Sequence, residues 1–381
     1  MAEDRRRDRA LVRAFAAYLR RQLGSRGRVA VVSRHRLRLP RRPDVLIISG
    51  SLAPRLRRAL DAGAARRLQF SGVANADAAP RAGLAVEVWD PWDRRSVGDP
   101  PSSFTVAAIV TTFNETEIID QLLDRLLADG IRVQVIDNWS TDGTFERVSD
   151  RATRESVSVE RWPQSGPNRY FDLAGLLARV EEVAHASVAD WVLHHDADEI
   201  HESPWDGVSL RNGLWAVDRF GFNAVDHFAM DFRPVDNRWE PGVDLATSFE
   251  CFELPPYSSY FTLVKGWKPQ PTKVDIAGTG GHEALFHDRR VFPYKFLIRH
   301  YPIRSQSHGE RKILGERKDR FDPAEREKGW HTHYDRFVEG SSFLWDPVAL
   351  HRFDQLDERL FIQRLSSAGL PGNPRPKESL T

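Results

Sequence analysis

The stretch "FTVAAIVTTF" at residues 104–113 decides the fold class. It is a continuous run of apolar and β-branched residues, which is typical of a strand that helices cover on both faces. A helical pattern follows it, and "IRVQVIDN" (131–138) and "DWVLHHDADEI" (190–200) read as further buried strands, with another helical pattern between them. Strands that alternate with helices predict an α/β domain around a mostly parallel, Rossmann-like sheet.

The composition is that of a globular protein with almost no net charge. Of the 381 residues, 41% are hydrophobic, and 55 Lys and Arg face 54 Asp and Glu. No global basic field is present, so nucleic acid is not expected as a partner. The single cysteine, Cys251, excludes an internal disulfide and a cysteine-based zinc site, which fits a reducing compartment.

No segment of the sequence approaches the ~18 consecutive apolar residues that a membrane span requires. Residues 1–23 are Arg-rich and amphipathic, but they contain acidic residues and lack a long apolar stretch, which argues against transit and secretion signals. We expect a helix docked on the body, with peripheral membrane contact as the alternative. The expected location is cytoplasmic, with membrane association left open.

Three regions are expected along the chain. Residues 1–100 read as a small N-terminal α/β unit of unknown role, residues 104–312 as the main domain, and residues 313–381 as a helical C-terminal extension. Within the first region, four short apolar runs predict strands and residues 54–67 predict a helix. The charged stretch 309–330 predicts a solvated helix.

Polar side chains stand at the ends of three predicted strands. In an open α/β sheet, ligands bind outside the carboxyl ends of the strands. The residues concerned are Thr111, Thr112 and Asn114 from the first strand, Asp137 and Asn138 from the second, and Asp196 and Asp198 from the third. Asp137 alone is explained as well by turn formation, but the acidic group "DADE" (196–199) follows buried residues too closely for a solvated loop. The convergence therefore predicts a ligand site.

The acidic group Asp196, Asp198 and Glu199 needs compensation by a cation or by protonation. Oxygen ligands suit Mg²⁺ or Mn²⁺, so a divalent cation is the expected compensation. Because neighbours along a strand point to opposite faces, at most one of His194 and His195 is expected to share this environment.

The start of the first helix carries negative charge. Glu115 and Glu117 occupy its first turn, and the sequence has no glycine-rich phosphate motif, so phosphate is not expected to be held there. A cation bound to the aspartates would instead balance the negative charge of a diphosphate ligand. Asn114 is expected to cap this helix, with Glu117 completing a capping box.

At this point the sequence resembles a known family. "VTTFNE" (110–115), "VIDNWSTDGT" (135–144) and "HHDADE" (194–199) are similar, in this order, to the three successive motifs of family 2 type glycosyltransferases with the GT-A fold. The resemblance covers about residues 104–200 and continues loosely to about 312. It implies a metal-dependent enzyme that moves a sugar from a UDP- or GDP-sugar to a hydroxyl of a glycan, lipid-linked or small-molecule acceptor, with inversion. No Gln-x-x-Arg-Trp sequence is present, so the processive synthases are poor models.

The resemblance also implies roles for individual residues. Asp198 would be the more direct ligand of Mn²⁺ or Mg²⁺, with Asp196 nearer the ribose and the metal, and His300 would be a later metal or diphosphate ligand or else a packed histidine. Arg304 and Lys312 would neutralise diphosphate, although solvation at the surface is the commoner fate of such residues. The residues expected along the nucleotide are Thr111, Thr112, Asn114, Glu115, Asp137 and Asp196.

An inverting transfer also requires a carboxylate that takes the proton of the acceptor hydroxyl. The candidates are Glu283, Asp226 and Glu250. Glu283 is preferred because Gly278, Gly280 and Gly281 before it predict a mobile loop that closes over substrate, with a solvated turn as the alternative.

Three other functions compete with this prediction. A sugar nucleotidyltransferase would normally place a glycine-rich, basic loop after the first strand, where this chain has "TTFNETE". A metal-dependent hydrolase would use the histidines and aspartates of "HHDADE". The third alternative is a non-catalytic nucleotide-binding module.

Overall fold

The computed structural model describes residues 97–253, 263–327 and 331–353, together with the backbone of four short strands before them. These strands are β1 (Val29–Ser33), β2 (Val45–Ser49), β3 (Arg67–Ser71) and β4 (Ala85–Trp89), and they pair in the order β1-β2-β4-β3. All four strands predicted in the N-terminal region are thus confirmed. The helix predicted over residues 1–23 lies outside the described residues, as does the one predicted over 54–67 apart from Arg67, which belongs to β3.

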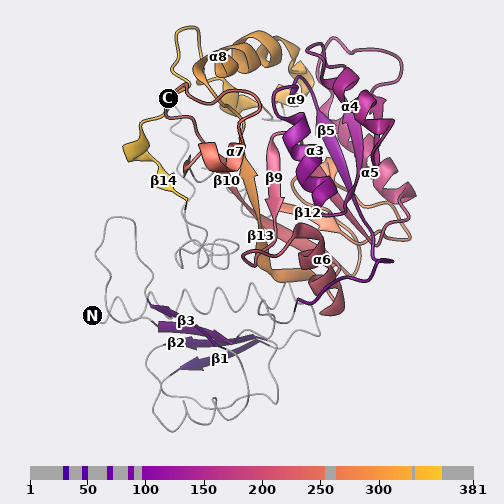
Figure 1. The fold of residues 1–381 in the computed structure, drawn as a ribbon, viewed down its shortest axis with the longest axis vertical. Coiled ribbons are helices and arrows are strands. Elements are labelled where there is room, and N and C mark those ends of the chain that lie inside the picture. The colour runs from indigo at the N-terminus through magenta and orange to yellow at the C-terminus, as the bar shows by residue number, and fades with distance from the viewer. Residues whose placement is uncertain are drawn as a thin grey trace.

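The main domain is built on one large mixed sheet (Figure 1). Its strands run in the order β14-β11-β10-β12-β8-β5-β6-β7, and β13 pairs with β10 and β9. Their bounds are β5 Val106–Thr112, β6 Arg132–Asp137, β7 Val157–Arg161, β8 Trp191–Asp196, β9 Glu199–Glu202, β10 Ala224–Phe232, β11 Cys251–Glu253, β12 Leu263–Trp267, β13 Val291–His300 and β14 His351–Arg352.

Strands β8, β5, β6 and β7 form a parallel half, which confirms the predicted class of sheet. The chain proceeds outward from β5 to β6 and β7, and then returns to place β8 on the other side of β5. The register sets Thr111 beside Asp196 and Thr112 beside Asp137. The order of the strands reverses between β5 and β8, and such a switch point opens a crevice at the carboxyl ends of the strands.

The other half of the sheet is mainly antiparallel. Strand β12 runs against β8, with Gly266 beside Leu193, and β10 runs against β12. A Cβ atom on Gly266 would lie only 2.6 Å from Cγ2 of Val225 and 2.9 Å from Cδ2 of Leu193, so a larger residue would force the neighbouring strands apart. The glycine therefore allows β12 to pack closely against β8, next to the site described below.

Helices cover both faces of the sheet. The helices are α3 Ile119–Ala128, α4 Thr144–Ala152, α5 Leu173–Ala186, α6 Leu210–Arg219, α7 Leu245–Ser248, α8 Gln306–Gly309 and α9 Pro323–Glu327. Val110 of β5 belongs to one core cluster with residues of α3 and α6, whereas Ile109 belongs to another with residues of α5. The alternation of β5 side chains thus explains why this strand is apolar throughout. None of the described helices is both long and apolar enough to span a bilayer.

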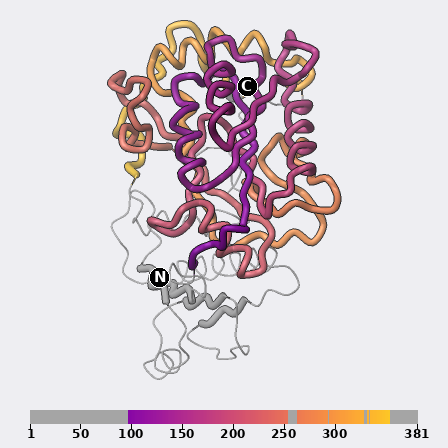
Figure 2. The backbone as a smooth tube through the Cα atoms, turned by 45° about the vertical axis from the view of Figure 1, so that its right-hand side comes forward, coloured from indigo at the N-terminus to yellow at the C-terminus, as the bar shows by residue number. Residues whose placement is uncertain are grey.

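The segment after β13 differs from the prediction. Instead of one solvated helix over 309–330, α8 leads into a π-helical run (Glu310–Arg317), a 3₁₀ turn (Lys318–Arg320) and α9. Two further 3₁₀ turns, Thr332–Tyr334 and Pro347–Ala349, follow. In Figures 1 and 2 this orange-to-yellow segment lies beside the helices that follow β5 and β6.

Two contacts attach this C-terminal segment to the start of α5. The amide of Phe171 donates to the carbonyl of Arg320 over 2.5 Å, and the amide of Ala174 donates to Oε1 of Glu325 over 3.2 Å. The boundary expected at residue 312 falls inside the π-helical run, and Lys312 itself is buried. The prediction of a solvated helix was wrong because its charged side chains bind partners on the main domain.

Candidate functional site

A cavity of about 270 Å³ lies at the carboxyl ends of β5 and β8, close to the lower end of the range for small-molecule sites. Polar residues line it from the ends of β5, β6, β8 and β13, from β12, and from the β8–β9 turn, the loop 280–282 and the C-terminal segment. Among the predicted site residues, those that line it are Thr111, Thr112, Glu115, Asn138, Asp196, Asp198 and His300. The fold therefore brings most of the predicted site together.

Asp196 has both carboxylate oxygens engaged. The hydroxyl of Thr111 donates to Oδ1 over 2.8 Å, and Nζ of Lys265 donates to Oδ2 over 2.7 Å. Lys265 is buried and also lies 2.7 Å from Oε1 of Glu199. Burial works against the charged form, but Lys265 outweighs it and lowers the pKa of Asp196. A buried lysine thus supplies part of the compensation that the acidic group requires.

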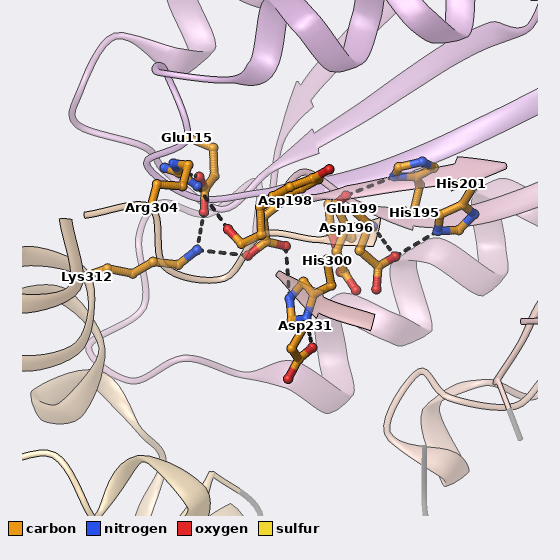
Figure 3. Close-up of polar contacts among 12 residues, drawn as sticks. Glu115, His195, Asp196, Asp198, Glu199, His201, Asp231, His300, Arg304 and Lys312 are labelled. Atoms are coloured by element: carbon orange, nitrogen blue, oxygen red, sulfur yellow. Dashed lines mark hydrogen bonds and ion pairs between the residues drawn. The ribbon is translucent and has the colours of Figure 1, made fainter. Parts of the chain in front are cut away.

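Asp198 is held by a second buried lysine. Nζ of Lys312 lies 2.8 Å from Oδ2 of Asp198 and 2.6 Å from Oε1 of Glu115, as Figure 3 shows. Arg304 is completely buried and lies 2.8 Å from the other oxygen of Glu115. Arg304 and Lys312, which the resemblance assigned to diphosphate, therefore neutralise carboxylates of the protein.

His300 lies between two carboxylates (Figure 3). Its Nδ1 donates to Oδ1 of Asp231 over 2.8 Å, and its Nε2 lies 3.7 Å from Oδ1 of Asp198. Burial opposes a charged ring, but Asp198 and then Asp231 raise the pKa of His300 to about 10. The Asp231 contact fixes the ring, so that Nε2 and Asp198 face the same point from two sides.

The two histidines of the motif point to different sides of β8, as the alternation predicted. His194 lines the cavity, and its Nε2 lies 4.0 Å from Oδ1 of Asp196. His195 stacks on His201 with ring centroids 3.9 Å apart, and Nε2 of His201 lies 2.8 Å from Oε2 of Glu199. Burial raises the pKa of Glu199 to about 7 against the charge of Lys265.

The buried group His195, Glu199 and His201 is compact enough to be considered as a metal site. The two rings lie only 20° from parallel, so their in-plane lone pairs do not converge on a common point. The ammonium group of Lys265 also engages both carboxylate oxygens of Glu199, so neither oxygen is left for a cation. We therefore describe this group as a packed, hydrogen-bonded support behind the cavity.

Asn114 and Asp137 do not belong to the cavity lining formed by the described residues. The capping box is wrong: Ile118 is the N-cap of α3, and Oδ1 of Asn114 accepts from the amide of Thr141 over 2.8 Å. Asp137 is completely buried, accepts from the amide of Ser140 over 3.0 Å, and has its pKa raised by burial. Both residues support the loops around the site.

The expected catalytic carboxylates lie elsewhere. Asp226 is buried 2.7 Å from Lys295, and Glu283 forms an ion pair with Arg289. Neither lines the cavity as enclosed by the described residues. Glu250 is exposed and paired with Arg352. The sequence around these carboxylates favoured a catalytic role, but in the fold each carboxylate forms an ion pair with a basic side chain instead.

The glycine loop before Glu283 does reach the cavity. Gly280 and Gly281 line it and have positive φ angles of 66° and 84°. A Cβ atom on Gly281 would lie 3.2 Å from Cε1 of His194, so the glycine permits a close approach of backbone to this side chain. Oε1 of Glu181 fixes the start of the loop by accepting from two of its amides, each over 2.8 Å.

Sequence reasoning missed the contribution of the C-terminal segment. Glu316, Arg317 and Arg320 line the cavity together with aromatic side chains. The rings of Phe321 and His331 stack with centroids 4.5 Å apart and an interplanar angle of 1°. The only available signal was the mixture of basic and aromatic residues in 317–334, which is also typical of a surface helix.

No protein-family model and no curated protein matches the chain. The chain is similar to the crystal structure of S. aureus TarS 1-349 in complex with UDP, with 17% sequence identity and a TM-score of 0.29 over 43% of this chain and 47% of that chain. It is also similar to the structure of TarS 1-349 in complex with UDP-GlcNAc, with 16% identity and a TM-score of 0.29 over 43% of this chain and 45% of that chain. A further structure of TarS 1-349 shows 14% identity and a TM-score of 0.31 over 56% of this chain and 63% of that chain. The chain thus spans less than two thirds of these TarS chains, and the likeness is too low to support a statement about function.

Proposed function

We propose that this protein is a glycosyltransferase that binds a nucleotide-diphosphate sugar in the cavity and transfers the sugar to an acceptor hydroxyl. The observation that carries this proposal is the convergence of Thr111, Asp196 and Asp198 on one cavity at the β5–β8 switch point, the place where open α/β sheets bind ligands. The order of the three sequence motifs agrees with it.

The residues present fit a divalent cation, Mn²⁺ or Mg²⁺, at Asp198 and His300. Nε2 of His300 and Oδ1 of Asp198 face each other, and Asp231 orients the ring through Nδ1, an arrangement typical of metal-ligating histidines. A cation bound there would displace the proton from Nε2, because only a deprotonated imidazole nitrogen ligates a metal. Asp196 is not proposed as a direct ligand, because Thr111 and Lys265 engage both of its oxygens. When bound, such an ion would stabilise the negative charge of the leaving diphosphate.

Glu316 is the best placed general base among the described residues. The other carboxylates that line the cavity each lie within 3 Å of a lysine, whereas the contact that Glu316 makes with a cation is 3.5 Å, to Nε of Arg311. In the proposed step, the acceptor proton moves to Glu316 while the acceptor oxygen bonds to the anomeric carbon. The bond from that carbon to the diphosphate oxygen breaks, and its electron pair stays on the diphosphate.

The experiment is a transfer assay with a panel of UDP- and GDP-sugars, with glycan, lipid-linked and small-molecule acceptors, and with and without Mn²⁺. We expect transfer by the native protein and a loss of at least about 100-fold in Asp198→Asn. Asp288→Asn is the matched control, because Asp288 is exposed and asparagine tolerates its positive φ of 55°.

Other outcomes would replace the proposal. Release of free sugar without an acceptor would identify a hydrolase, and release of pyrophosphate from a nucleoside triphosphate and a sugar phosphate would identify a nucleotidyltransferase. Tight binding of a nucleotide with no turnover of any donor would identify a non-catalytic binding module.

A further inference from the structure

The carboxylates of the cavity engage the two buried lysines beside them. Lys265 is shared by Asp196 and Glu199, and Lys312 is shared by Asp198 and Glu115, all at distances below 3 Å. A ligand that carries negative charge would have to compete with these contacts. Other cations of the cavity must therefore be considered.

Two arginines of the C-terminal segment stand outside these pairs. Arg317 donates to the hydroxyl of Tyr334 over 2.8 Å, and Arg320 donates to Oδ1 of Asn138 over 3.0 Å, so both partners are uncharged. In the part of the chain that the structure describes, neither guanidinium lies within ion-pair distance of a carboxylate. Both arginines line the cavity.

Burial works against the charged form of Arg317, but Tyr334 and then Asp198 and Glu115 raise its pKa, so nearby carboxylates compensate its charge in part without forming an ion pair. Burial and then the nearby charge of Arg317 lower the pKa of Arg320, which shows that the two guanidinium groups repel each other. The guanidinium of Arg320 also lies 4.0 Å from the ring centroid of Phe113, a contact that restricts its orientation. Two like charges held in a concave site favour an anion that lies between them.

We propose that Arg317 and Arg320 form an anion-binding subsite in the wall of the cavity, and that its ligand is a phosphate or diphosphate group. A guanidinium has five N–H donors in a planar fork that matches phosphate oxygens, and each arginine uses few of them in the contacts above. The proposal deepens the proposed function and rests on it only for the source of the anion. That source is either the diphosphate of the donor or a phosphate on the acceptor.

The test measures binding of inorganic pyrophosphate to the full chain by calorimetry. We expect Arg317→Gln and Arg320→Gln each to weaken pyrophosphate binding by at least about tenfold. Arg326→Gln is the matched control, since Arg326 belongs to the same segment but pairs with Asp335 at the surface. If Arg317→Gln does not fold, Arg317→Lys keeps the charge, loses the fork and should weaken binding by a smaller factor. Unchanged pyrophosphate binding in both arginine variants would overturn the subsite.

Competition with UDP or GDP distinguishes the two sources. If the donor supplies the anion, the nucleotide displaces pyrophosphate and both variants lose affinity for the diphosphate but not for the free nucleoside. If the acceptor supplies the anion, pyrophosphate still binds when the nucleotide is present, and this binding is weakened in the two arginine variants. Arginine-dependent binding without any sugar transfer would leave the subsite standing and the proposed function rejected. Sugar transfer with unaltered kinetics in both variants would support the proposed function and reject the subsite.

Discussion

Lys312 donates a hydrogen bond of 2.8 Å to Asp198, although 114 positions separate the two residues in the sequence. Asp198 belongs to the β8–β9 turn, whereas Lys312 belongs to the π-helical run of the C-terminal segment. The contact joins the acidic motif to a segment that was predicted from the sequence to be solvated. The cavity therefore depends on both regions of the chain.

Replacing Lys265 should destabilise the fold. Lys265→Met leaves the buried Glu199 and the half-buried Asp196 without their shared cation, and loss of one partner of a buried ion pair costs about 3–5 kcal/mol. The free energy of unfolding in urea measures the effect. Lys268→Met is the control, because Lys268 is partly exposed and its pair with Asp218 should contribute about 1 kcal/mol or less. Equal losses in both variants would show that Lys265 has no special structural role.

The parallel half of the sheet and its polar strand ends were predictable because both depend on local sequence. A continuous apolar run specifies β5 or β8, and the residues after it must then lie at the carboxyl edge, as Thr111 and Asp196 do. Lys265 was not predictable in the same way. It lies in a strand of five buried residues, and only the antiparallel pairing of β12 with β8 brings it to Asp196. The contact between Arg320 and Asn138 is equally non-local.

Metal binding should distinguish the two aspartates of the motif. Asp198→Asn and His300→Gln remove the donors that face each other, so Mn²⁺ affinity in the presence of nucleotide should fall by at least about tenfold. Asp196→Asn should retain metal binding if it folds, since Thr111 and Lys265 already engage the native carboxylate. Electron paramagnetic resonance of free Mn²⁺ measures the affinity without requiring activity. Loss of Mn²⁺ binding only in the Asp196 variant would identify Asp196, and not Asp198, as the metal ligand.

Buried His227 should make the fold sensitive to acid. Burial lowers its pKa to about 3, from an ordinary value of 6.5, while its Nδ1 contacts the carbonyl of Leu263 over 3.0 Å. Below pH 6.5 the unfolded chain therefore binds a proton that the folded chain refuses, and stability falls by about 1.4 kcal/mol per pH unit. His227→Gln should reduce the slope of unfolding free energy against pH by this amount between about pH 6 and pH 4. The exposed His287 provides a control, because His287→Gln should leave the slope unchanged.

Glu316 should act as the proton acceptor of the transfer, and Glu283 should not. Glu316 lines the cavity and burial raises its pKa, whereas Glu283 is bound to Arg289. Glu316→Gln should lower kcat by about 10²–10⁴-fold with little change in the KM of the donor, because a general base acts in the transition state. Its loss should also remove the acidic limb of the kcat profile, which a purely structural role would not do. Glu283→Gln and the exposed Glu310→Gln on the same π-helical run should keep kcat within about threefold. A large loss of kcat in Glu283→Gln, with Glu316→Gln unaffected, would return the role to the residue that the sequence favoured.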